Sequence, residues 1–117
     1  CMFISNDNRG LCLKFENGYN ISVQWGKGNY CSNKDMEDFI PEGRNVSATA
    51  EMLIFSDDDE KDKLLDFQEF DTNIIGWLTS EDIGHIIGLL SNPLLDIDFV
   101  NKQIREYFFK KKENKVV

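Results

Sequence analysis

The chain of 117 residues contains a single histidine, which limits the chemistry that one copy can perform. Zinc sites of the His-x-x-x-His type and two-histidine facial triads each need a second imidazole, so one chain cannot form them. No apolar run approaches the ~20 residues that a membrane span requires. We therefore expect no transmembrane segment, no metal centre and no cofactor.

Cysteine is also scarce, and the three cysteines are Cys1, Cys12 and Cys31. Their number is odd and they form no CxxC pair, so neither a disulfide framework nor a zinc ribbon is indicated. Residues 1–15 lack the long apolar segment of a secretory signal. These features predict free thiols in a reducing compartment, and hence a cytoplasmic protein.

Basic residues are outnumbered, and the formal net charge is −8. The imbalance is local: residues 35–71 hold thirteen acids and three bases, whereas residues 101–117 hold six bases and two acids. An acidic chain repels phosphate backbones, so direct nucleic-acid binding is not expected. A basic surface on another protein would attract it. The alternative interpretation is a solvated surface that only keeps the protein soluble.

Alternation of apolar and polar residues is the clearest structural pattern, and it occurs in residues 11–16 and 19–25. Asn17-Gly18 joins the two runs, which predicts a β-hairpin with a two-residue type I′ turn. The apolar positions of both runs fall on one face. We expect this face to bury Leu13, Phe15, Ile21 and Val23.

The length predicts one domain covering residues 1–117. Further strands are predicted at 2–4, 46–55, 64–70 and 73–78, with an acidic turn at 56–63. Thr79 is suited to cap a helix that ends at Asn92-Pro93, and a second helix starts at Asp96 or Asp98 and runs to about Lys112. The inner helix faces carry Ile83, Ile86, Ile87, Leu90, Val100, Ile104 and Tyr107. The fold class is therefore α+β: an antiparallel sheet, built from the N-terminal hairpin and the following strands, with two C-terminal helices packed on it.

The acidic turn supplies the first candidate site, formed by Asp57, Asp58, Asp59, Glu60 and Asp62. These carboxylates are too closely spaced to be buried together, because like charges make desolvation costly. We expect them to face water, where closely spaced carboxylates can imitate nucleic-acid phosphates and occupy a basic groove. The same stretch fails as a calcium loop, since Lys63 replaces the glycine of loop position six in residues 58–69.

A second candidate site is a ligand-binding set made of Trp25, Lys27, Tyr30 and Arg44. Aromatic rings stack on bases and cations bind phosphates, so these residues suit a small nucleotide. The alternative is that Trp25 belongs to the core and Lys27 is an ordinary loop charge.

His85 is predicted to point away from the apolar stripe of its helix. Because it is exposed, we assign no catalytic residue.

Phe99 and Phe109 lie on the second predicted helix, away from its inner face. An apolar pair outside the core stripe indicates either additional core or a contact surface. We therefore consider homo-oligomer formation through these two residues.

Four segments resemble small uncharacterised bacteriophage accessory proteins: residues 2–6, 13–18, 21–26 and 29–31. The resemblance covers residues 2–33. It implies a protein acting in the cytoplasm of an infected bacterium, of a kind that often inhibits host defences such as CRISPR nucleases. We expect a non-enzymatic inhibitor that binds a host protein through an acidic face. The alternative is a sponge that sequesters a defence signalling nucleotide; a small hydrolase ranks last, because no nucleophile–base pair is visible.

Overall fold

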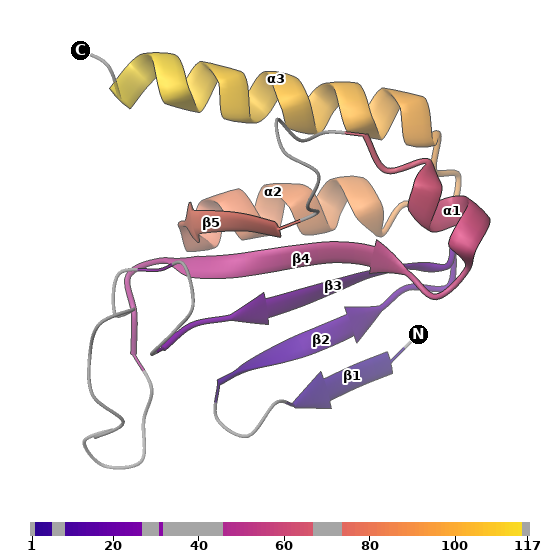
Figure 1. Ribbon diagram of the computed structural model, residues 1–117, viewed down its shortest axis with the longest axis horizontal. Coiled ribbons are helices and arrows are strands. Elements are labelled where there is room, and N and C mark those ends of the chain that lie inside the picture. Colours follow the sequence, from indigo (N-terminus) through magenta and orange to yellow (C-terminus); the bar gives the residue numbers. More distant parts are fainter. Residues whose placement is uncertain (1, 6–8, 27–30, 32–45, 67–73, 116–117) are drawn as a thin grey trace.

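The strands follow one another across a single sheet in the order in which they occur in the chain (Figure 1). The computed structural model describes residues 2–5, 9–26, 31, 46–66 and 74–115. The elements are β1 (Met2–Ser5), β2 (Gly10–Lys14), β3 (Tyr19–Gln24), β4 (Ala50–Ser56), α1 (Asp59–Lys63), β5 (Ile74–Leu78), α2 (Ser80–Leu90) and α3 (Ile97–Lys115). All neighbouring strands are antiparallel. The α+β prediction is confirmed.

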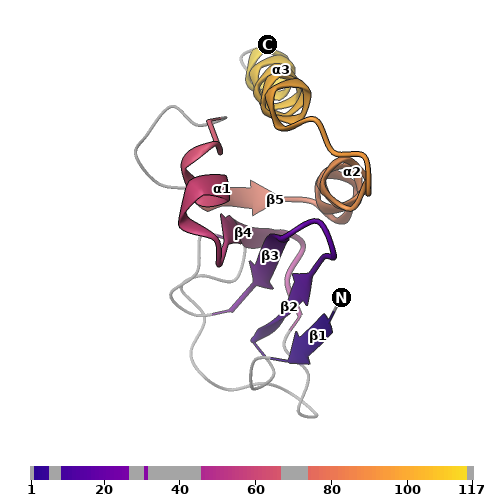
Figure 2. The same ribbon diagram turned by 90° about the vertical axis from the view of Figure 1, so that its right-hand side faces the viewer.

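The core lies between the sheet and the two C-terminal helices. Its fully buried side chains include Ile21, Met52, Ile54, Ile86 and Ile104. Ile83, Ile87 and Phe108 are partly buried against this core, as are Leu13 and Phe15 of the hairpin. In both ribbon views α3 lies beyond the β5 end of the sheet, and β1 is the strand farthest from it (Figures 1 and 2). Buried side chains of both helices therefore form one hydrophobic cluster with those of β3, β4 and β5.

The N-terminal hairpin is confirmed, but its turn differs from the predicted one. Phe15 N–H donates to the Tyr19 carbonyl at 3.0 Å, and Gly18 N–H donates to the Phe15 carbonyl at 3.1 Å. The loop therefore has three residues, and of these only Gly18 has positive φ, at 92°. A type I turn followed by a glycine bulge has this pattern, whereas type I′ would need positive φ at Asn17 as well.

Asn17 has a structural reason to avoid the type I′ conformation. Its side-chain Nδ2 donates to the Leu90 carbonyl at 2.5 Å and to the Asn92 carbonyl at 3.2 Å. Its Oδ1 accepts from Tyr19 N–H at 3.0 Å. The carbonyls at the end of a helix lack intrahelical partners, so Asn17 satisfies groups that α2 leaves open. The hairpin tip is thus fastened to the C-terminal end of α2.

The predicted acidic turn at 56–63 is wrong, because α1 occupies most of it. Asp58 is the N-cap, and its carboxylate accepts from Glu60 N–H and Lys61 N–H. Acids in a first helical turn are also favoured by the helix dipole. The strand predicted at 64–70 is wrong for residues 64–66, which follow α1 without forming a strand. Residues 67–70 lie outside the described part, and β4 begins at Ala50 rather than at residue 46.

The helix starts follow the predicted capping rules. The Thr79 hydroxyl accepts from Asp82 N–H and the Asp82 carboxylate accepts from Thr79 N–H, which completes a capping box at the start of α2. Asp96 caps α3, since its Oδ1 accepts from the N–H groups of Asp98 and Phe99. Of the two predicted caps for this helix, Asp96 is therefore the one used. The helix continues beyond Lys112 to Lys115.

A β-bulge interrupts the pairing of β5 with β4. Ala50 pairs with Leu78 and Met52 pairs with Ile75, so two residues of β5, Gly76 and Trp77, stand opposite one residue of β4. Trp77 has a φ of 59°, a left-handed conformation that is uncommon for a bulky residue. The bulge therefore changes the course of this outer strand of the sheet.

Candidate functional site

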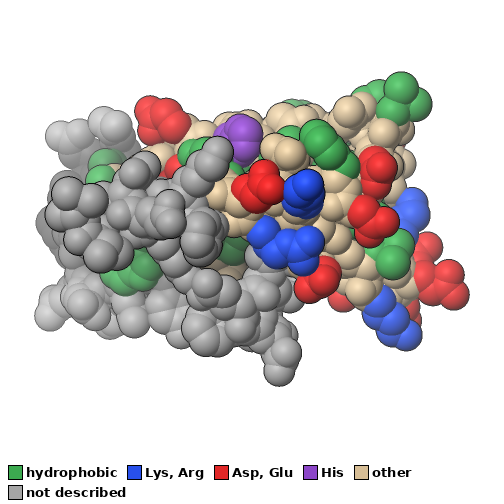
Figure 3. All heavy atoms as spheres, turned by 90° about the horizontal axis from the view of Figure 1, so that it is seen from above, with side chains coloured by type: hydrophobic (Ala, Val, Ile, Leu, Met, Phe, Trp, Pro, Cys, Tyr) green, Lys and Arg blue, Asp and Glu red, His purple; other side chains and the backbone are tan. Residues whose placement is uncertain are grey.

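The acidic cluster, comprising Asp57, Asp58, Asp59, Glu60 and Asp62, lies where β4 gives way to α1. The first four residues are exposed and Asp62 is half-buried. Acidic side chains gather at the end of the molecule where α1 lies, as the view from above shows (Figure 3). The expected exposure is confirmed for the four consecutive acids and is wrong for Asp62, whose carboxylate turns back to accept from Ser56 N–H. The cluster also leads into a helix instead of closing a hairpin.

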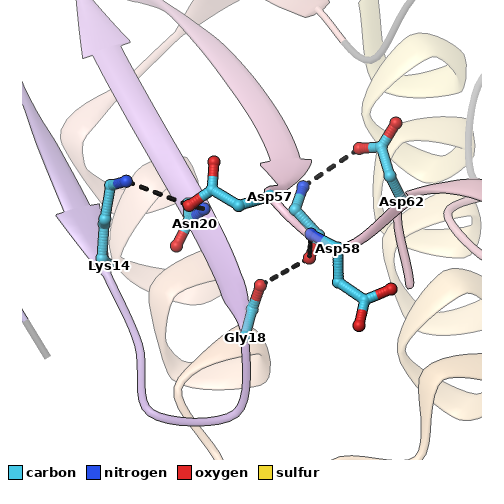
Figure 4. Close-up of polar contacts among 7 residues, drawn as sticks. Lys14, Gly18, Asn20, Asp57, Asp58 and Asp62 are labelled. Atoms are coloured by element: carbon cyan, nitrogen blue, oxygen red, sulfur yellow. Dashed lines mark hydrogen bonds and ion pairs between the residues drawn. The ribbon is translucent and has the colours of Figure 1, made fainter. Parts of the chain in front are cut away.

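Asp57 is paired with residues of the neighbouring hairpin (Figure 4). Its Oδ2 accepts from Lys14 Nζ at 3.0 Å and from Asn20 Nδ2 at 3.3 Å. Lys14 and Asn20 are direct partners in the β2–β3 register, so the sheet holds both donors on one face. The hydrogen bond from Lys14 is the main cause that lowers the pKa of Asp57. Asp57 therefore stays ionised, and its charge is partly balanced by Lys14.

Two other acids fasten α1 to the sheet. Asp62 accepts from Ser56 N–H at 3.0 Å, and Asp58 caps the helix with hydrogen bonds of 2.9 and 3.3 Å. The Ser56 hydroxyl donates to the Gly18 carbonyl at 2.7 Å and accepts from Asp58 N–H at 3.2 Å. Figure 4 shows Gly18, Asp58 and Asp62 gathered around the end of β4. Ser56 thus connects the acidic cluster to the hairpin loop.

Asp59 and Glu60 are the two acids of the cluster whose carboxylates do not stabilise the described part of the fold. No side-chain hydrogen bond or ion pair joins either carboxylate to another described residue. The surface around them is mixed, because Lys61 and Lys63 follow within the same helix. Lys61 Nζ donates to the Asn17 carbonyl at 2.7 Å, so this cation is partly engaged within the fold. The carboxylates most available to a partner are therefore those of Asp59 and Glu60.

Of the four residues of the alternative nucleotide site, only Trp25 belongs to the described part of the chain. Trp25 is half-buried and packs against the hydrophobic core, and its backbone N–H donates to the Arg9 carbonyl at 2.9 Å. Lys27, Tyr30 and Arg44 lie outside the described residues. The interpretation of Trp25 as a contributor to the core is confirmed.

A second polar cluster, which the sequence did not reveal, joins the two C-terminal helices. The buried carboxylate of Asp82 accepts from the Tyr107 hydroxyl at 2.5 Å. The His85 ring stacks on the Tyr107 ring with centroids 4.4 Å apart. His85 is exposed, as predicted, and in the described part of the chain no hydrogen bond links it to a carboxylate. The cluster therefore has the arrangement of a helix clamp and lacks the oriented imidazole of a catalytic triad. The capping spacing of Thr79 and Asp82 was visible in the sequence, but the contact with Tyr107 was not.

Other expectations concern metals, membranes and the aromatic pair. Within the described ranges, no group of three or more His, Cys, Asp or Glu side chains is placed to hold a metal ion. None of the described helices combines the length and apolar character that crossing a bilayer requires. Phe99 is 56% exposed, so its interpretation as additional core is wrong. The side chain of Phe109 lies outside the described residues.

Comparison with known proteins identifies no relative. No family model, no curated protein and no solved structure matches the chain. The function must therefore be argued from the residues of the site, because a fold class alone does not specify an activity.

Proposed function

We propose that this is a non-enzymatic bacteriophage protein that inhibits a host defence system, such as a CRISPR-type nuclease. It acts in the host bacterial cytoplasm by binding a host protein with a basic surface. The observation that carries the proposal is the run of exposed carboxylates from Asp57 to Glu60 at the start of α1. The phage context is supported by the resemblance of residues 2–33 to phage accessory proteins.

The geometry favours binding to a preformed cationic groove. Asp57, Asp58 and Asp62 are held by hydrogen bonds to β2, β3, α1 and β4, so these three side chains lose little conformational entropy when a partner docks. Asp59 and Glu60 have no described side-chain partner, so binding them breaks no pair within the described part of the chain. Carboxylates presented in this way accelerate encounter with a basic surface, and the effect weakens as salt screens the charges.

The proposal is tested with a double variant, Asp59→Asn with Glu60→Gln. This variant removes two charges and leaves the hydrogen bonds of Asp57, Asp58 and Asp62 in place. The matched control is Asp98→Asn with Glu106→Gln, which removes two charges from exposed positions of α3. DNA cleavage by a panel of purified CRISPR nucleases is measured with each protein, at low and at moderate salt.

We expect wild type to inhibit at least one nuclease. The Asp59/Glu60 variant should inhibit more weakly and associate more slowly at low salt, while the control behaves as wild type. If the Asp59/Glu60 variant inhibits as strongly as wild type at both salt concentrations, the acidic cluster is only a solubilising surface. If no nuclease is inhibited and native mass spectrometry finds a co-purifying nucleotide, the sponge alternative replaces the proposal. In that case the double variant should bind its ligand as well as wild type does.

A further inference from the structure

The outer edge of β1 is open among the described residues. β1 pairs with β2 on one side and ends the sheet order, so its other side presents unpaired backbone N–H and C=O groups. All four residues of the strand are exposed, and Phe3 reaches 85%. Both ribbon views place β1 at the edge of the sheet away from α3 (Figures 1 and 2). The strand is therefore available for pairing with another strand.

The two edges of the sheet differ in how they oppose such pairing. On β5, the bulge at Gly76 and Trp77 breaks the regular edge, which is a common protection against strand addition. β1 pairs with β2 through four consecutive residues without a register shift. Its sequence, Met-Phe-Ile-Ser, contains no charge and no proline, in a chain that is 29% charged. The β1 strand is short, but it lacks the bulge, the charge and the proline that commonly oppose strand addition.

The sequence of β1 is complementary to itself. Phe3 pairs with Leu13, which pairs with Ile21, so Phe3 lies on the core face of the sheet; Met2 and Ile4 lie on the other face. A two-fold axis perpendicular to the sheet joins two edges in antiparallel fashion and keeps each face continuous. With Phe3 on this axis, Phe3 faces Phe3 of the second copy, and Met2 faces Ile4 of the second copy. All three pairs are then apolar.

We infer that β1 pairs with β1 of a second copy of this chain, in this register, to form one continuous antiparallel sheet. A charged partner of either sign would find no complementary charge on the strand, whereas a second copy supplies an apolar side chain opposite Met2, Phe3 and Ile4. The contact is small compared with the ~1,600 Å² of a standard interface, so we expect a weak dimer. The inference is independent of the proposed inhibitor function.

The dimer contact and binding through the acidic cluster should respond to salt in opposite directions. The net charge of −8 makes two copies repel each other, while β1 itself carries no charge. Added salt screens the repulsion and should therefore strengthen the dimer. Binding of a basic partner through Asp59 and Glu60 should instead weaken with salt. Failure of one proposal thus leaves the other standing.

The test measures mass by sedimentation velocity and light scattering over a wide range of protein concentrations. Wild type is compared with Phe3→Lys and Phe3→Glu, and Phe99→Lys is the matched control at another exposed phenylalanine. Phe3→Lys reduces the overall negative charge, which by itself would favour association. In the proposed register it places two like charges on the two-fold axis. Circular dichroism confirms that each variant is folded.

We expect wild type and Phe99→Lys to form dimers, and each Phe3 variant alone to be monomeric. A mixture of Phe3→Lys and Phe3→Glu should restore dimers as mixed species, because opposite charges then face each other. A wild-type chain that is monomeric at every concentration would overturn the inference. So would a dimer that survives both Phe3 variants, or one that Phe99→Lys abolishes; the last result would favour the Phe99 face instead.

Discussion

The hydroxyl of Tyr107 donates a hydrogen bond to the buried carboxylate of Asp82 at 2.5 Å. The other oxygen of this carboxylate accepts from Thr79 N–H at 2.9 Å. One charge therefore completes the capping box of α2 and holds α3 against it. Removing either partner should affect the start of one helix and the docking of the other.

The change Tyr107→Phe should lower the free energy of unfolding by about 1.5–3 kcal/mol, because it removes a hydrogen bond to a charged acceptor. Tyr19→Phe is the matched control, since the Tyr19 hydroxyl donates to a neutral acceptor, the Lys61 carbonyl, at 3.2 Å. The control should lose about 0.5–1.5 kcal/mol. Urea unfolding of both variants provides the measurement, and an equal loss would contradict a special role for Asp82.

The same contact predicts a stability change at high pH. The hydrogen bond to Asp82 is the main cause that raises the pKa of Tyr107 from 10.0 to about 12. A group with a raised folded-state pKa stabilises the fold fully below its unfolded pKa and loses this contribution as the pH rises through the folded value. Stability should therefore fall between pH 10 and about 12 more steeply in wild type than in Tyr107→Phe. Burial also raises the pKa of Tyr19, and this residue is unchanged in the variant. Ultraviolet titration of tyrosinate in the variant should therefore lack the component that ionises at about pH 12 in wild type.

The change Asn17→Gly distinguishes the observed loop from the predicted type I′ turn. Glycine suits positive φ, so a type I′ turn would tolerate it. In the observed loop, the change removes the hydrogen bonds to the Leu90 and Asn92 carbonyls. We expect a loss of about 1–3 kcal/mol by thermal or urea unfolding. Glu16→Gln, at the exposed neighbouring position, should be close to neutral, and a neutral Asn17→Gly would contradict this role of Asn17.

Two glycines within α2 should be replaceable with a gain in stability. Apart from its chain neighbours and the backbone of its own helix, a Cβ added at Gly84 or Gly88 would meet no heavy atom of the described residues within 4 Å. Alanine loses less backbone entropy than glycine in a helix, so Gly84→Ala and Gly88→Ala should each add about 0.5–1 kcal/mol. Gly10→Ala is the contrasting variant, since its Cβ would lie 1.9 Å from the Val23 carbonyl oxygen. A gain in melting temperature from the first two, and a clear loss from the third, is the expected pattern.

Patterns within short stretches of sequence predicted most of the elements. Alternation identified β2 and β3, and the Thr79 capping position identified the start of α2. The hairpin turn was mispredicted because the conformation of Asn17 depends on carbonyls of Leu90 and Asn92, more than seventy positions away. α1 was missed because a row of acids suits both a solvated turn and a helix start. The hydrogen bond between Asp62 and Ser56 N–H, which fastens α1 to the end of β4, has no signature in composition.

The composition of the sequence indicated where the acidic cluster lies, but it did not distinguish the roles of the five carboxylates. Five neighbouring carboxylates are equivalent in the sequence, yet the fold gives them different roles. Lys14 reaches Asp57 only because the β2–β3 register places it beside Asn20. Asp58 and Asp62 secure α1, which leaves Asp59 and Glu60 as the acids without a described side-chain partner. This distinction depends on contacts between strands and could not be inferred from spacing.

The sequential strand order also has a consequence for synthesis on the ribosome. Each strand pairs with the strand before it, so the sheet can grow as the chain emerges from the N-terminus. The helices that cover Ile21, Met52 and Ile54 emerge last. During translation these side chains form an uncovered apolar surface until α2 and α3 leave the exit tunnel. Nascent chains stalled with α2 and α3 still inside the tunnel should therefore recruit chaperones, and chains in which residues up to 108 have left the tunnel should release them.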